Sequence, residues 1–278
     1  MDTNKSEPRL PQSDRSTSVA AGHWVLARAG KRVLRPGGLK LTNRMLDAAD
    51  LSGKKVLEFA PGLGRTATLM LDRGIASYTG VDQDPDAVAR VQAVVGPRGR
   101  VVNANAQSTG LESESTQVVV GEAMLTMQGD KGKREIIAEA FRLLEPGGCY
   151  AIHELGLTPD SIGAELADQL RRRLARTIRV NARPLTRGEW CGLLEQAGFC
   201  IEWVGYEPMA LLSPRRNLAD EGVGGVVRIL RNVARDKELR RRVLDMRATF
   251  NEYRDNLTGI AIIARKPATN LEEKEIRR

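Results

Sequence analysis

The feature that most constrains the fold is a glycine-containing turn between a short apolar strand pattern and a helix pattern. The run 55–60 is typical of a buried strand, and it stops at Pro61-Gly62-Leu63-Gly64. Apolar residues at helical spacing follow over 66–71. A strand that passes through a glycine turn into a helix is the usual first unit of a parallel α/β sheet. The chain is therefore expected to fold around such a sheet.

The alternation of strand and helix patterns continues along the chain. Further strands are predicted at 77–82, 100–106, 117–124, 149–155, 199–206 and 259–264, with helices from Asp84-Pro85 and over 133–144 and 186–197. Strands that alternate with helices in this way pair in parallel. The predicted fold class is α/β, with a doubly wound, mostly parallel, seven-stranded sheet of Rossmann-like topology.

The glycine turn and an acid after the next strand together predict a nucleoside site. Gly62 and Gly64 lack a Cβ atom, so the backbone can approach a ligand closely. Asp82 ends the following strand, and parallel pairing would bring its carboxylate to the same sheet edge, where it can accept the hydrogens of a ribose diol. The run 62–67 also fits the dinucleotide fingerprint G-x-G-x-x-G/A, so this pattern alone leaves the cofactor open.

The same residues resemble the class I S-adenosylmethionine-dependent methyltransferases. The stretch from Glu58 to Gly64 is similar to their first motif, an acid followed by a Gly-x-Gly turn, and Asp82 matches their second acid. The run 144–148, LEPGG, is similar to the motif before their fifth strand. The resemblance covers about residues 40–155 and implies the Rossmann-like methyltransferase fold, S-adenosyl-L-methionine as cofactor and methyl transfer as the reaction.

The resemblance also implies a set of cofactor residues near the ends of the first four strands. These are Glu58, Ala60, Gly62, Gly64, Asp82, Gln83, Asn105, Ala106 and Glu122. Ala60 departs from the family pattern because a glycine is usual there. Asn105 stands where an Asp commonly contacts the adenine amine; its carbonyl can still accept a hydrogen bond, and the alternative is that it only forms a turn.

Glu58 favours an aminoacyl cofactor on physical grounds as well. A carboxylate near the turn would repel a pyrophosphate but attract the ammonium of a methionine moiety. An NAD(P)-binding oxidoreductase remains the alternative within the same fold. A noncatalytic protein that binds S-adenosylmethionine is the alternative from another functional class.

Two stretches interrupt the α/β pattern with apolar stripes at helical spacing, at 158–185 and at about 214–256, and each is predicted to be a helical cap insertion. The other predicted segments are a disordered tail at 1–20, a cofactor-binding half with an N-terminal helical segment at 21–157, the C-terminal part of the domain at 186–267 and a charged tail at 268–278. Insertions at these places would form a lid over the mouth of the sheet.

The acceptor is expected above the carboxyl ends of the fourth and fifth strands. His153 is the candidate general base there because imidazole titrates near neutral pH, and Glu154 beside it is the second catalytic candidate. The alternative for both is a hydrogen-bonded wall residue. His23, the other histidine, lies in an N-terminal segment that the pattern does not place.

Composition narrows the partners. The net charge of +8 permits an anionic acceptor or an acidic membrane surface near the arginines of 171–183 and 240–242, but a solvated helix face is the favoured interpretation. Only 4% of residues are aromatic, which disfavours nucleic acid. No residue spacing indicates a metal site, and no apolar run is long enough for a membrane span. Three irregularly spaced cysteines fit a cytoplasmic location, and the expected partner is a small-molecule acceptor.

Overall fold

The computed structural model describes residues 16–268, so most of the two predicted tails lies outside the described residues. Its sheet has the strand order β3-β2-β1-β4-β5-β8-β7, and a two-residue strand, β6, pairs with β5. The strands are β1 (Lys55–Phe59), β2 (Ser77–Asp82), β3 (Gly99–Asn103), β4 (Thr116–Glu122), β5 (Leu144–Leu157), β6 (Leu185–Thr186), β7 (Cys200–Pro208) and β8 (Leu257–Arg265). Only β8 runs antiparallel to its neighbours, which confirms the predicted doubly wound, mostly parallel sheet.

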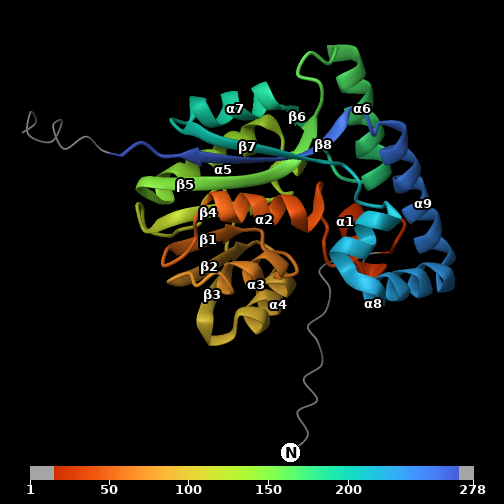
Figure 1. Cartoon of the computed structure of the whole chain (residues 1–278), viewed down its shortest axis with the longest axis horizontal. Helices are drawn as coiled ribbons and strands as arrows, with labels where there is room; N and C mark the ends of the chain where they lie inside the picture. The colour runs from red at the N-terminus through yellow and green to blue at the C-terminus, as the bar shows by residue number, and fades with distance from the viewer. Residues whose placement is uncertain (1–15, 269–278) are drawn as a thin grey trace, which may run out of the picture.

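Helices cover both faces of the sheet (Figure 1). On one face lie α2 (Gly38–Ala48), α3 (Arg65–Leu71) and α4 (Pro85–Val95), which bury their apolar sides against residues such as Val118 and Val120. On the other face lie α5 (Asp130–Leu143) and α7 (Arg187–Gln196), packed against Val119. Because side chains alternate along a strand, an almost continuous apolar run in β4 can serve two cores.

The remaining helices gather at one end of the sheet (Figure 1). They are α1 (Gly22–Arg28), α6 (Ala164–Ile178), α8 (Pro214–Arg235) and α9 (Lys237–Glu252), and the short 3₁₀ turns are Gly96–Arg98 and Leu125–Met127. Residues of α1, α6 and α9 form a third apolar cluster with Leu155 and Leu157 at the end of β5. None of the helices within 16–268 has the length and apolar character needed to cross a bilayer.

Several strands differ from their predicted ranges, and the differences at the ends of β3 and β5 affect the site. β3 ends at Asn103 instead of at 106, because the chain then turns back in an isolated bridge between Asn105 and Ser108. β5 continues to Leu157 instead of ending at 155, because its antiparallel pairing with β8 extends to Leu157 opposite Leu257. Residues 153 and 154 are therefore inside the sheet and not at its mouth.

Gly259 on β8 is expected to be sensitive to any added side chain. A Cβ atom there would lie 2.8 Å from the backbone of Pro36 and Gly37, which cannot move aside as a side chain could. We expect Gly259→Ala to lower the free energy of unfolding by about 1–3 kcal/mol, measured by urea denaturation. The matched control is Gly192→Ala in α7, where a Cβ would meet nothing within 4 Å. This control should stabilise the protein by up to about 1 kcal/mol, and equal effects of the two changes would contradict the argument.

Candidate functional site

A polar cavity of about 320 Å³ opens at the carboxyl ends of β1, β2 and β4. Among the residues predicted to hold a cofactor, those that line it are Glu58, Ala60, Gly62, Asp82, Gln83 and Glu122. His23 and Trp24 of α1 line it, and Arg32, Leu34 and Arg35 line it from the segment after α1. The structure thus brings together side chains from distant parts of the sequence at one sheet edge.

The turn between β1 and α3 has a left-handed backbone at three positions. The φ angles are 51° at Ala60, 57° at Gly62 and 73° at Gly64. Ala60 therefore adopts the conformation that favours glycine, which agrees with its position in the motif. A Cβ at Gly62 would meet only the Ala60 carbonyl at 3.8 Å, whereas one at Gly64 would lie 3.3 Å from Val94. Gly62 therefore leaves room beside the cavity, while Gly64, which does not line it, allows α3 and α4 to pack closely.

Glu58 is a buried acid at the wall of the cavity. Its side chain lies on the strand face shared with Tyr78, whose hydroxyl donates a hydrogen bond of 2.6 Å to Glu58 Oε2. Burial raises the pKa of Glu58 to about 8, and the Tyr78 hydrogen bond opposes this only in part. A cation that entered the cavity beside Glu58 would favour its ionised form.

Asp82 lies at the end of β2 with its carboxylate fixed by backbone donors. The amide of Asp84 donates to Oδ1 at 3.0 Å, and the amide of Gly62 donates to Oδ2 at 3.4 Å. Burial raises the pKa of Asp82, and these backbone hydrogen bonds oppose that effect. The contact with Gly62 links the glycine turn to the second acid, as the parallel pairing of β1 and β2 requires.

Glu122 accepts hydrogen bonds from four other side chains. One of these, Arg35, also forms an ion pair with it. Its Oε1 accepts from Thr42 at 2.6 Å and from His153 Nδ1 at 2.8 Å. Its Oε2 accepts from Arg35 and Thr66. Burial alone would raise the pKa of Glu122, but Arg35 and the hydrogen bonds outweigh it and lower the pKa to about 2. Glu122 lines the cavity as predicted, yet its oxygens are already occupied within the protein.

The structure does not support the catalytic role predicted for His153. The residue is 0% exposed and is not among the residues that line the polar cavity. Its Nε2 is bonded to the Pro36 carbonyl and its Nδ1 to the Glu122 carboxylate. Both ring nitrogens therefore have partners within the protein, and neither is directed at the cavity. The prediction placed His153 at the mouth because it assumed that β5 ended two residues earlier.

Glu154 is also buried, but its hydrogen bonds go to the turn after β4 and not to the residues that surround His153. Its carboxylate accepts backbone hydrogen bonds from Met124, Leu125 and Thr126 at 2.8–3.0 Å and another from the Thr126 hydroxyl at 2.7 Å. It therefore fixes the turn after β4, and the geometry gives it no direct contact with the cavity.

Asn105 and Ala106 lie beyond the end of β3 and do not line the cavity. The Asn105 side chain accepts a hydrogen bond from the Gln107 backbone at 2.9 Å, which is the local turn that was the alternative for this residue. The adenine contact predicted for these two residues stays a prediction.

A second cavity, of about 90 Å³, adjoins the polar one and is apolar. Four residues line both cavities: His23, Leu34, Ala123 and Met127. The remaining wall is mostly apolar and includes Leu174 of α6 and Met246 and Phe250 of α9. The end of β5 contributes Leu155. The two cavities thus meet at residues 23, 34, 123 and 127.

His23 lies where the two cavities meet. The sequence pattern did not predict a position for this residue. Its ring packs against Trp24, with 4.7 Å between ring centroids, and has no hydrogen-bond partner in the described part of the chain. Burial lowers the pKa of His23 to about 4, so the ring is neutral near pH 7. Unlike His153, it has a lone pair that no other described residue occupies.

Arg35 was also missed by the sequence analysis, because nothing in the local sequence links it to Glu122, 87 positions away. Its Nη1 donates to both Glu122 and Thr66. Its Nε and Nη2 are buried without a partner in the described residues, although Arg35 lines the polar cavity. Unpaired donors at a cavity wall suit a ligand that carries an acceptor such as a carboxylate.

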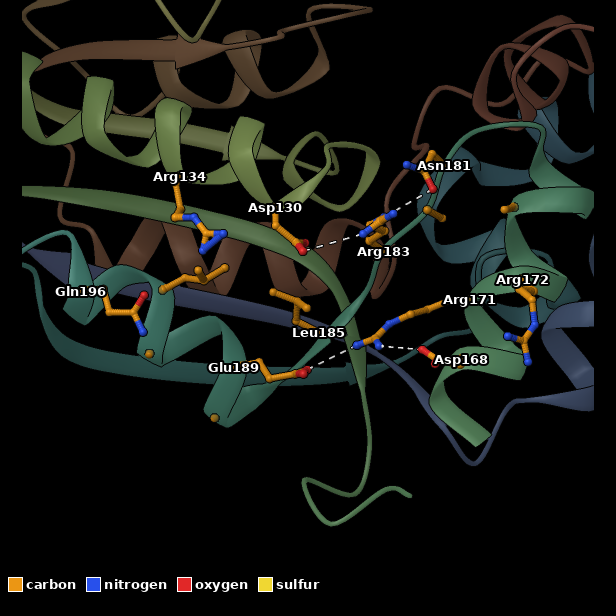
Figure 2. Close-up of a pocket in the computed structure, with 15 residues that line it drawn as sticks. Asp130, Arg134, Asp168, Arg171, Arg172, Asn181, Arg183, Leu185, Glu189 and Gln196 are labelled. Carbon is orange, nitrogen blue, oxygen red and sulfur yellow. Dashed lines mark hydrogen bonds and ion pairs between the residues drawn. The ribbon is translucent and has the colours of Figure 1, made fainter. Parts of the chain in front are cut away.

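A further cavity, of about 810 Å³, is an arginine-containing groove between α5, α6 and α7. Figure 2 shows Arg171 between Asp168 and Glu189, and Arg183 between Asp130 and Asn181. The ion-pair distances are 3.3 and 3.6 Å for Arg171 and 3.7 Å for Arg183. The groove shares no lining residue with the polar cavity. Its acids offset much of the positive charge, so we do not assign the reaction to it.

Residues 16–268 contain no cluster of three or more His, Cys, Asp or Glu side chains that could hold a metal ion.

Known proteins with related sequences and folds agree with this geometry. The family model described as a methyltransferase domain matches residues 56–148. An uncharacterized protein of Haemophilus influenzae is 36% identical over 251 residues, which are 88% of this chain and 98% of that protein. The [4+2]-cyclase SpnF has a similar fold, with a TM-score of 0.66 at 18% identity, covering 88% of this chain and 92% of that chain.

A further structure with this fold was determined with ligands. Phosphoethanolamine N-methyltransferase 2 of Haemonchus contortus, in complex with phosphomonomethylethanolamine and S-adenosylhomocysteine, has a TM-score of 0.65 at 16% identity. The match covers 92% of this chain and 59% of that chain. Sequence motifs, fold and comparisons agree, and the chain belongs to the class I S-adenosylmethionine-dependent methyltransferases. It is an S-adenosylmethionine-dependent enzyme, so the NAD(P) alternative is set aside.

The buried pair of Arg35 and Glu122 is expected to be essential for stability. Arg35→Met would leave the Glu122 carboxylate buried without its cation and should lower the free energy of unfolding by about 3–5 kcal/mol in urea denaturation. Arg254→Met is the matched control, because Arg254 pairs with Asp255 at the surface, where both side chains are more than 70% exposed. Its cost should be at most about 1 kcal/mol. A loss for Arg35→Met no larger than the control's would contradict the role assigned to this pair.

Proposed function

We propose that this methyltransferase transfers a methyl group to a small, largely apolar acceptor that binds in the apolar cavity beneath the cap. The observation that carries the proposal is the junction of the two cavities at His23, Leu34, Ala123 and Met127. The polar cavity suits a charged nucleoside, and the apolar cavity beside it suits a molecule with little charge. A reaction between the two ligands would occur where the cavities meet.

The residues of the polar cavity fit S-adenosylmethionine in three respects. Space beside Gly62 that a Cβ would fill allows close approach of the ligand to the backbone. Glu58 would hold the ammonium of the methionine moiety, and the unpaired donors of Arg35 would hold its carboxylate. Asp82 would accept hydrogen bonds from the ribose hydroxyls. When bound, the cofactor supplies an electrophilic methyl group on a sulfonium.

The chemical character of the second cavity defines the acceptor class. Its wall is formed mainly by leucine, methionine, isoleucine, valine and phenylalanine side chains, and Thr126 and His23 are the polar exceptions. A charged or strongly hydrated acceptor would lose its water there without compensation. We therefore favour a compact acceptor with an apolar body and one reactive N–H or O–H group directed toward His23.

His23 is proposed as the general base for that group. Its neutral ring would accept the acceptor's proton while the lone pair of the acceptor's N or O atom forms the new bond to the methyl carbon. The electron pair of the broken carbon–sulfur bond would remain on sulfur, and His23 would hold the proton until solvent removed it. Atoms and charge balance, because the positive charge of the sulfonium is replaced by that of the imidazolium.

The cap helices would act as the lid of this site. Side chains of α1, α6 and α9 close the apolar cavity from above the end of β5. Exclusion of water strengthens electrostatic interactions at the junction and keeps the acceptor close to the methyl group. The lid also explains why the inserted helices carry apolar residues on the sides that face the sheet.

The experiment that tests the function uses the full-length protein and S-adenosylmethionine labelled in its methyl group. The label is supplied with a metabolite extract, and the products are partitioned between water and an organic solvent. We expect enzyme-dependent label in the organic phase, and the labelled compound identifies the acceptor. Label recovered only in charged, water-soluble products would contradict the acceptor class. Failure to bind S-adenosylhomocysteine in calorimetry would contradict the placement of the cofactor.

Cofactor binding should release a proton from Glu58 near neutral pH. With a pKa of about 8, the Glu58 carboxyl is mostly protonated at pH 7, and an ammonium bound beside it would lower that pKa. Titration calorimetry with S-adenosylhomocysteine in buffers of different ionisation enthalpy should therefore show release of up to about one proton, with affinity increasing as the pH rises toward 8. Glu58→Gln is isosteric and should abolish the release; an unchanged release in this variant would rule out Glu58 as its source.

Substitution of His23 should affect turnover without affecting cofactor binding. Loss of a general base typically reduces the rate by about 10²–10⁴-fold, so we expect a decrease of this size in kcat for His23→Gln with the identified acceptor. S-adenosylhomocysteine affinity should stay unchanged. Added imidazole should partly restore the rate of His23→Ala, which a merely structural role would not allow. In wild type, activity should be level above about pH 5 and should fall as the pH approaches 4, where His23 becomes protonated.

A further inference from the structure

Helix α8 attaches to the rest of the protein mainly through polar contacts. Glu221 Oε1 accepts hydrogen bonds from the backbone amides of Arg32 and Val33 at 2.8 and 2.9 Å. Asp220 Oδ1 accepts from the Leu39 amide at 3.1 Å. Arg228 donates from Nη2 to the Gly30 carbonyl at 3.0 Å. The backbone of α8 is not helical at Gly222, where the helix is kinked. Asp220 and Glu221 hold the part before the kink against residues 32–39, and Arg228 holds the part after it against Gly30, which leaves the opposite side of that part facing outward.

The outward side of α8 carries an apolar stripe. Leu218, Val223, Val227 and Leu230 are 51%, 71%, 58% and 64% exposed, respectively. Positions 223, 227 and 230 have the spacing of a single helical stripe. Val226, Ile229 and Val233, by contrast, are partly buried, so the cap accounts for them and leaves the outer stripe uncovered within residues 16–268. Figure 1 shows α8 at the outer edge of the helical part of the molecule.

The charged residues on the exposed side of α8 are all basic. Arg215, Arg231 and Arg235 are exposed, whereas the two acids of the helix are turned inward. Asp220 is 7% exposed as a residue, and the Glu221 side chain is 1% exposed. An exposed surface that combines aliphatic side chains with arginines and no acid is complementary to a surface that offers both hydrocarbon and negative charge.

We propose that the outer face of α8 binds an anionic lipid bilayer. Leu218, Val223, Val227 and Leu230 would enter the boundary between headgroups and acyl chains, while the three arginines reach the lipid phosphates. A second copy of the chain fits less well, because a symmetric contact between two such faces would bring the two sets of arginines together. This binding is peripheral and concerns a different surface from the methyl-transfer site.

The test measures flotation of the full-length protein with vesicles of phosphatidylcholine alone or of phosphatidylcholine with phosphatidylglycerol. We expect binding to the anionic vesicles only, and weaker binding at high salt. The double variant Val227→Glu, Leu230→Glu should lose this binding. Arg215, Arg231 and Arg235 replaced together by Ala should weaken it by about 100-fold, since each arginine near such a surface contributes about a factor of five.

The matched control is Leu244→Glu on α9, because Leu244 is 53% exposed but lies outside α8. This variant should bind the anionic vesicles like wild type. Circular dichroism should show that all variants remain folded, as expected for changes at exposed positions. Absence of vesicle binding would overturn the proposal, and so would equal losses in the α8 and Leu244 variants. Dimerisation that Val227→Glu, Leu230→Glu abolishes would assign the stripe to a second copy instead.

Discussion

The arrangement of the site depends on one buried carboxylate, that of Glu122. Burying a charge is costly unless each of its oxygens has partners, and here Arg35, Thr42, Thr66 and His153 supply them. These partners come from the segment before α2, from α2 itself, from α3 and from β5. A single ionised group therefore fixes the position of the segment that contributes Leu34 and Arg35 to the cavity walls. His153 belongs to this support, since it also holds the Pro36 carbonyl.

Under the proposed function, the two cavities divide the chemical requirements of methyl transfer. The polar cavity places ionisable groups where a charged nucleoside needs partners, and burial keeps the Glu58 carboxyl mostly protonated until a cation arrives. The apolar cavity provides little to stabilise charge, which is why the ring of His23 stays neutral at its edge. A neutral base beside an apolar cavity is suited to a reaction that begins with a neutral acceptor. The same low polarity that lowers the pKa of His23 also limits which acceptors can enter.

The sequence predicted which elements meet at the polar cavity, because their meeting depends on local patterns. The strand at Lys55–Phe59, the glycine turn and Asp82 follow one another closely along the chain, and parallel pairing of neighbouring strands determines their relative positions. The position expected for His153 at the mouth of the sheet was wrong because it depended on where β5 ends, and pairing with β8 about a hundred residues later extends that strand. His23 and Arg35 could not be placed at all. Their roles arise from contacts of the N-terminal segment with the cap and with β4, and no periodicity encodes such contacts.

Helix α8 illustrates a further limit of reasoning from apolar spacing. The sequence indicates an apolar stripe near 226–233 within the predicted helical insertion at about 214–256, but the helix is apolar on two sides. Polar residues on both sides of the kink at Gly222 decide which side faces inward. Before the kink, Asp220 and Glu221 satisfy backbone amides of residues 32–39 that would otherwise lack partners, and after it Arg228 donates to the Gly30 carbonyl. Once these bonds are made, Val223, Val227 and Leu230 have no place in the core. Their exposure to water is unfavourable in free energy, and only burial against another apolar surface would remove that penalty.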